Sequence, residues 1–301
     1  MLLIIASFAT TINIEQLKKE FNQEVIELNV FKKRFHSYLG KSCLDDIICY
    51  KKTIKKLKTW PTVQSDPILN KLLTKKVTKL NFDDSYWQNL VEKLKLKNIN
   101  LEKSQFVSIV DLDKQLYIVT FWDETTQQYH YIGNDLISSG NIRREAEVKY
   151  GENHYFKTPA GVFKSKNGWR SEGKLSEDNI TLGYGYEGRY IFYFGKQDSI
   201  RFNTFDKNKE KIYDTQRWKL IKDSLDLAVH SHKSRKKMGQ PNSHGCVRMS
   251  DELNRFLDNN SVLHKNAFDG DKWIHKYAKE PLQTKYHQYA GEYLIIFDKV
   301  N

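Results

Sequence analysis

The sequence predicts an α+β fold, in which an all-α N-terminal module precedes a mainly β domain. Between residues 14 and 96, apolar side chains recur at helical spacing among charged ones, which is typical of amphipathic helices. From residue 104 onward, short runs of β-branched and aromatic residues are bounded by turn residues, which is typical of strands. With 301 residues, 39% of them hydrophobic, the chain can form one large or two modest domains with a core.

The N-terminal module is expected to span residues 13–100. Its helices are expected at residues 15–35, 45–57, 66–77 and 84–96, with Pro61 and Pro67 breaking the run between the second and the third. Residues 1–12 are apolar and include Ser7-Phe8-Ala9, so they resemble a signal-peptide remnant. No other stretch is long enough to span a bilayer, and no motif in the module indicates its role.

The β-rich part begins with a predicted hairpin. Its strands are expected at residues 105–110 and 115–122, followed by strands at 128–132, at 162–163 and at 226–229, and by a helix at 250–257 that Ser250 caps. Residues 263–301 form a C-terminal extension, in which residues 292–297 favour one more strand. The Gly- and Tyr-rich segment 167–195 suggests a flap that carries Tyr184 and Tyr186, and the polar residues 198–222 are assigned to the same cover.

The net charge and the cysteine content restrict the possible functions only weakly. A formal charge of +12 favours polyanionic partners, but much of the excess lies in Lys-rich stretches that are most simply solvated helix faces. No nucleic-acid-binding motif is present, which argues against nucleic acid as a partner. Cys43 and Cys49 are either a disulfide pair, which would leave Cys246 as the single free thiol, or two half-buried cysteines.

The densest chemistry lies at residues 242–249, which read Asn-Ser-His-Gly-Cys-Val-Arg-Met. A cysteine nucleophile needs a base that takes its proton, and an oxyanion needs donors such as the amides of Gly245 and Cys246. His230 and His232, at the end of an apolar run, are the candidate bases. The residue types alone leave three interpretations open: a nucleophile, an inert core cysteine, or a zinc site. The zinc ligands would be His230, His232, His244 and Cys246.

Two motifs resemble one known family. Residues 243–248, Ser-His-Gly-Cys-Val-Arg, resemble the signature of the L,D-transpeptidase catalytic domain, the YkuD-like family. Residues 158–163, Thr-Pro-Ala-Gly-Val-Phe, resemble its T-P-x-G-x-F segment, for which a structural turn is the expected role. The resemblance covers a catalytic domain at residues 104–262 and implies that family's mainly β fold.

The resemblance also implies roles for individual residues. Cys246 would attack a peptide carbonyl and form a thioester, His230 rather than His232 would be the base, and the carbonyl of Ser231 would orient its ring. The residues that would shape the oxyanion and substrate site are Ser243, His244, Gly245 and Arg248. Family members use this cysteine without a metal, so neither a metal nor a cofactor is expected.

The expected substrate is a peptidoglycan tetrapeptide stem, attacked outside the cytoplasmic membrane in the periplasm or cell envelope. The acceptor would be a second stem, giving a 3→3 cross-link, or the lysine of an envelope protein. With water as acceptor, the enzyme would be an L,D-carboxypeptidase. A zinc hydrolase and a non-catalytic wall-binding protein remain the alternatives from other classes.

Overall fold

The computed structural model describes residues 84–124, 126–142, 149–151, 154–175, 183–233, 238–269, 272–273 and 289–300. The expected signal-peptide remnant, the helices before residue 84, and Cys43 and Cys49 lie outside these ranges. No helix within them is long and apolar enough to cross a membrane.

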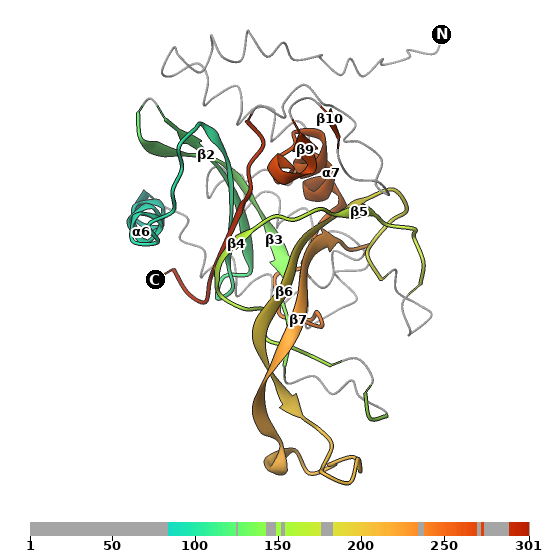
Figure 1. Cartoon of the computed structure of the whole chain (residues 1–301). Coiled ribbons are helices and arrows are strands. Elements are labelled where there is room, and N and C mark those ends of the chain that lie inside the picture. Colours follow the sequence, from blue (N-terminus) through green and yellow to red (C-terminus); the bar gives the residue numbers. More distant parts are fainter. Residues whose placement is uncertain are drawn as a thin grey trace, which may run out of the picture.

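A mixed, curled sheet organises the described residues. It has nine strands in the order β4-β11-β1-β2-β3-β8-β7-β6-β5 across these residues. The pairs β1–β11 and β7–β8 are parallel, and the other neighbours run antiparallel. The strands, most of which are labelled in Figure 1, are β1 (Gln105–Asp111), β2 (Leu116–Asp123), β3 (Gln128–Ser138), β4 (Gly161–Lys164), β5 (Trp169–Arg170), β6 (Tyr190–Asn203), β7 (Lys219–Ser231), β8 (Val247–Met249) and β11 (Tyr293–Phe297).

The strands β1, β2 and β11 are buried on both faces, which explains their nearly continuous apolar sequences. Alternate residues point to two different cores. One face, with Phe106, Tyr117 and Leu294, packs into the core shared with β6, β7 and α7 (Asp251–Asn259). The opposite face, with Val107 and Ile118, packs into a second core.

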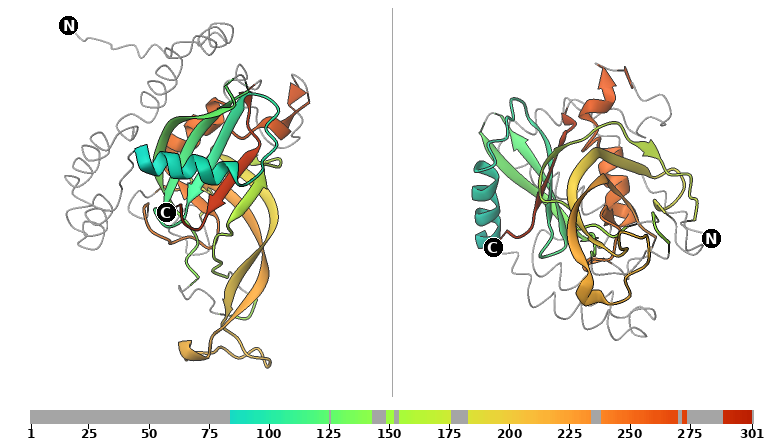
Figure 2. Two further views of the ribbon diagram at one scale, coloured as in Figure 1. Left: turned by 90° about the vertical axis from the view of Figure 1, so that its left-hand side faces the viewer. Right: turned by 60° about the horizontal axis from the view of Figure 1, so that its bottom comes forward.

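The helix α6 (Asp84–Lys95) covers that second core. Tyr86, Leu90 and Leu94 recur at helical spacing and are buried against β1, β2 and β11. Figure 2 shows the helix lying across the strands. The last helix expected for the N-terminal module is therefore present, but its apolar face is part of the core of the β-rich domain.

The strands β6 and β7 form a long twisted ribbon that extends away from the rest of the sheet (Figure 1). Residues 198–222, which we expected to belong to a cover over the site, lie in this ribbon and in the turn at its tip, which contains the short 3₁₀ helix η1 (Thr215–Arg217). That prediction was wrong, because residues 198–203 pair with residues 219–224 as the outer part of the ribbon, where most side chains are exposed or only partly buried.

Residues beyond 262 contribute to the fold. The expected strand at residues 292–297 is present as β11 and lies between β4 and β1. The 3₁₀ helix η3 (Lys265–Ala267) and the short pair β9 (Phe268–Asp269) and β10 (Lys272–Trp273) precede it. The segment expected to be an extension thus supplies an interior strand of the sheet.

Candidate functional site

The parallel pairing of β7 and β8 brings the two histidines and the cysteine motif together. Val229 pairs with Val247 and His230 with Arg248, so Cys246, one residue before Val247, stands level with Ala228. Alternation then places His230, Cys246 and Arg248 on one face. The intervening Val229 and Val247 are fully buried in the core on the other face, which fixes this register.

The Cys246 thiol is half-buried at the start of β8 and donates to the main-chain oxygen of Asp226 over 3.5 Å. Burial raises the pKa of this thiol above its ordinary value, although the Ala228 amide and Arg248 lower it. The strand β8 separates Cys246 from α7, which begins at Asp251 and whose first turn Ser250 caps, so the N-terminus of that helix does not directly follow the cysteine.

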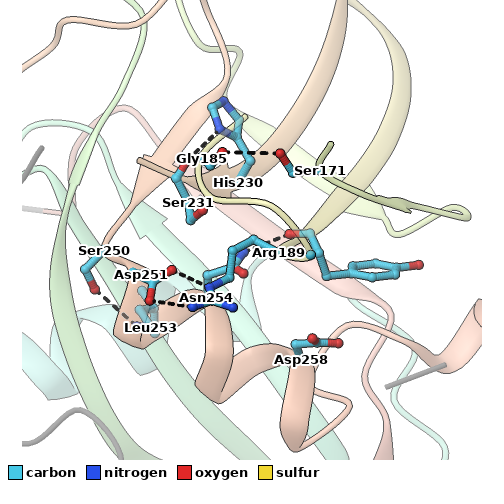
Figure 3. Close-up of polar contacts among 12 residues, drawn as sticks. Ser171, Gly185, Arg189, His230, Ser231, Ser250, Asp251, Leu253, Asn254 and Asp258 are labelled. Atoms are coloured by element: carbon cyan, nitrogen blue, oxygen red, sulfur yellow. Dashed lines mark hydrogen bonds and ion pairs between the residues drawn. The ribbon is translucent and has the colours of Figure 1, made fainter. Parts of the chain in front are cut away.

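The His230 ring is buried, and its Nδ1 lies 2.9 Å from the carbonyl oxygen of Ser231. A carbonyl only accepts, so Nδ1 carries the proton and Nε2 is the basic nitrogen. This is the contact that the motif led us to expect of Ser231 (Figure 3). Burial, together with the nearby Arg248 cation, lowers the pKa of His230 to about 3, so the imidazole is neutral at pH 7.

The other two histidines of the motifs, His232 and His244, differ in burial: one is buried and the other is exposed. His232 is also buried, and its main-chain N–H donates to the oxygen of Met249 over 2.9 Å. His244 is exposed and stacks on Tyr155, with ring centroids 4.1 Å apart. No three His, Cys, Asp or Glu residues within the described ranges converge as a metal site would require. The four proposed ligands therefore do not fit a zinc centre.

Ser243 fixes the backbone around the cysteine. Its Oγ donates to the Cys246 carbonyl over 2.5 Å and accepts from the Gly245 N–H over 3.0 Å. The φ of Gly245 is +140°, which favours glycine. We expected the Gly245 amide to face a substrate oxygen, but it would first have to leave Ser243. The amide of Cys246 is the better candidate donor in this conformation.

Thr158 connects the two sequence motifs. Its side chain is almost fully buried, and Oγ1 donates to the Gly245 carbonyl over 2.6 Å while it accepts from the Gly140 N–H over 2.8 Å. We expected only a structural turn at this segment. The residue instead holds the carbonyl that immediately precedes Cys246, and its position in the second motif was the signal that could have pointed to it.

Arg248 lies two residues after the cysteine, on the same face of β8, and pairs with His230. Its guanidinium donates to the main-chain oxygen of Asn242 over 3.2 Å, which braces the loop that carries residues 242–246. Its positive charge also lowers the pKa of both His230 and Cys246. The side chain can therefore both hold the loop and present a cation to the site.

The segment 183–189, here called the lid, covers the histidine. The ring of Tyr184 meets that of His230 edge to face, with centroids 5.1 Å apart, although the side chains of Tyr184 and Tyr186 are both partly exposed to solvent. A Cβ on Gly185, whose φ is +83°, would lie 1.9 Å from Ser231 Oγ. Ion pairing of Arg189 with Asp251 fastens the lid to α7, as Figure 3 shows.

The sequence is similar to one protein family over most of this region. The family described as L,D-transpeptidase catalytic domain matches residues 105–262, which include both motifs and every strand from β1 to β8. No curated protein matches the sequence.

Solved structures of low sequence identity are also similar. An L,D-transpeptidase from Xylanimonas cellulosilytica is 19% identical with a TM-score of 0.30, and the match covers 66% of this chain and 63% of that one. Bd1075 of Bdellovibrio bacteriovorus is 16% identical with a TM-score of 0.30, covering 66% and 50%. An L,D-transpeptidase from Mycobacterium smegmatis is 12% identical with a TM-score of 0.28, covering 64% and 59%. The chain thus spans between half and two thirds of the length of these proteins.

Proposed function

The chain belongs to the L,D-transpeptidase catalytic domain family, and we propose that it is a peptidoglycan L,D-transpeptidase that works through a thioester on Cys246. The observation that carries this proposal is the placement of His230 and Cys246 on one face of two paired strands, with the histidine tautomer set by Ser231.

The proposed reaction begins with two neutral groups. Because burial raises the thiol pKa and lowers that of His230, the thiol and the imidazole are both uncharged at neutral pH. Cys246 attacks the carbonyl of the donor while its proton passes to Nε2 of His230. The histidine then gives this proton to the leaving amine. The main-chain carbonyl of Ser231 stabilises the imidazolium that forms between these steps.

The remaining site residues would stabilise the negative charge of the tetrahedral intermediate and contact the substrate. The developing oxyanion would take a hydrogen bond from the Cys246 amide, and from that of Gly245 if Ser243 releases it. Arg248 would add a positive charge near the tetrahedral intermediate or pair with a donor carboxylate. His244, exposed and stacked on Tyr155, would contact the substrate beside the thiol.

The proposed donor is a tetrapeptide stem, cleaved before its terminal D-alanine, and the acceptor is a second stem or an amine of an envelope protein. The lid supports transfer over hydrolysis, because Tyr184 covers one side of His230 and so limits the access of water. Such substrates lie outside the cytoplasmic membrane, so we also propose export to the periplasm or cell envelope.

Mass spectrometry of disaccharide-tetrapeptides incubated with the protein tests this function. We expect cross-linked dimers with the wild type and none with Cys246→Ala. Loss of D-alanine without dimers would identify an L,D-carboxypeptidase, and identical products from both proteins would refute the thioester mechanism. Asparagine variants of the two buried histidines test the base, because His230→Asn should abolish product formation and His232→Asn should retain it.

A further inference from the structure

A carboxylate that the mechanism above does not use lies beside the candidate nucleophile. Asp226 precedes His230 by four residues on β7, so alternation places both side chains on the face that carries Cys246. The Asp226 side chain is exposed, while its main-chain oxygen accepts from the Cys246 thiol over 3.5 Å. A negative charge is thus held within reach of any group that the thiol attacks.

Tyr193 on β6 orients this carboxylate. Its hydroxyl donates to Asp226 Oδ1 over 2.7 Å. The ring of Trp169 contacts that of Tyr193, with centroids 5.7 Å apart, and that of Tyr184, with centroids 5.9 Å apart. Since Tyr184 lies on His230, a row of aromatic rings runs from the histidine to the carboxylate. Asp226 lies at the far end of this row.

Lys196 stands directly opposite Asp226 in the register of β6 and β7. No ion pair found within the described ranges joins these two exposed side chains. An acid and a base side by side, each open to solvent, fit the two charges of a zwitterion, whose ammonium would meet the acid and whose carboxylate would meet the base.

The spacing along the strand suits the donor of the proposed reaction. Asp226 is two residues from Ala228, which stands level with Cys246, and two strand residues span about 7 Å. The family resemblance implies that the third residue of the donor stem is diaminopimelate, whose carbonyl the thiol would attack. In this residue, three methylene groups separate the amino-acid centre next to the attacked carbonyl from the one that ends the side chain. The reach of that side chain is therefore comparable with this spacing along the strand between the position level with the thiol and Asp226.

We propose that Asp226, oriented by Tyr193 and faced by Lys196, binds the ammonium of the zwitterionic side-chain end of the donor's third residue. This proposal rests on the proposed function and specifies the donor class. The donor is favoured over the acceptor because an acceptor amine attacks only when it is unprotonated, whereas a nearby carboxylate stabilises the protonated form.

Isothermal titration calorimetry on Cys246→Ala, which cannot turn over, tests the proposal. The two probes are a disaccharide-tetrapeptide, whose only free amine is on diaminopimelate, and the same compound acetylated at that amine. We expect the free amine to bind about tenfold more tightly, the size of one charge-assisted hydrogen bond. Adding Asp226→Asn should remove this difference. Adding Asp198→Asn, an equal charge change at an exposed β6 position further from the thiol, should preserve it.

Three results would overturn the ammonium site. The first two are equal binding of both probes to Cys246→Ala and equal weakening of both by the added Asp226→Asn. The third is an effect of Asp226→Asn, made alone with Cys246 intact, on cross-linking but not on probe binding, which would assign the carboxylate to the acceptor. Release of D-alanine by the wild type is measured separately. Discrimination between the probes without release would refute the proposed function and leave the ammonium site standing. Release of D-alanine without discrimination between the probes would support the proposed function and refute the ammonium site.

Discussion

Replacing Thr158 with valine tests whether the buried hydroxyl maintains the backbone at Cys246. Valine has nearly the volume of threonine, so the change removes one hydroxyl and leaves the packing in place. It leaves the Gly245 carbonyl and the Gly140 N–H without the partners they have at 2.6 Å and 2.8 Å. The effect should therefore fall on both stability and activity.

The magnitude follows from the burial of these two groups. A buried polar group that loses its partner costs about 1–3 kcal/mol. Gly245 is buried and Gly140 only partly so, which places the expected loss for Thr158→Val at about 2–4 kcal/mol of unfolding free energy. A shift of the Gly245 carbonyl also moves the neighbouring Cys246, so we expect D-alanine release to slow by about tenfold or more, since ~1.4 kcal/mol of barrier is a factor of ten.

Urea denaturation and D-alanine release measure the two effects, with Thr158→Ser as the matched control. Serine keeps the hydroxyl and loses one methyl group, which costs about 1 kcal/mol. A valine variant as stable and as active as the serine variant would refute the argument that this hydroxyl holds the loop.

Three further predictions concern the thiol, the lid and the buried histidines. Alkylation of Cys246 by iodoacetamide should have its midpoint above the ordinary cysteine pKa of about 8.5, and Arg248→Met should raise it further, because the guanidinium lowers the thiol pKa. Gly185→Ala should reduce kcat/KM at least about tenfold, because the new Cβ would displace the lid from β7. The unfolding free energy should rise with pH between about 3 and 6.5, because burial lowers the pKa values of His230 and of His264, a buried residue just before η3, to about 3. Both imidazoles therefore bind protons in that range only when the chain is unfolded.

Each of these predictions has a control. Gly188→Ala, at a glycine with similar φ but open space around it, should leave kcat/KM nearly unchanged, and an equal loss in both variants would mean that backbone strain alone is responsible. His264→Gln should reduce the pH slope by about 1.4 kcal/mol per unit, and an unchanged slope would argue against a neutral buried imidazole. A thiol midpoint below 8 would point to a preformed ion pair with His230 instead of two neutral groups.

Much of the sheet could be predicted because β1, β2 and β11 are buried on both faces and therefore have nearly continuous apolar sequences. The outer part of β6 and β7 could not, since most of its side chains are exposed or only partly buried and its sequence is mainly polar. The apolar stripe of α6 predicted a helix, but a stripe does not say what it packs against. Its partner is the sheet, so helix and strands share one core.

Some features of the candidate site could also be predicted from the sequence, and others could not. The motifs pointed to Cys246 and His230, and the register of β7 and β8 brings these residues to one face. The hydrogen bond from Thr158 to Gly245 joins residues far apart in sequence, so no local pattern could predict it. The strand β8 was missed because three residues are too few to show alternation before the helix signal of residues 250–257 begins.

The position of β11 has a consequence for how the domain is made. During synthesis β1 emerges early, whereas the strand that pairs with it in parallel and separates it from β4 emerges after almost all other described residues. Until then β1 has an open, apolar edge, which invites pairing with other chains. Such long-range pairing slows folding, so completion of the sheet must wait until β11 has left the ribosome. Nascent or truncated chains that lack residues 293–297 should therefore aggregate, and a holding chaperone that shields β1 would raise the yield of folded protein.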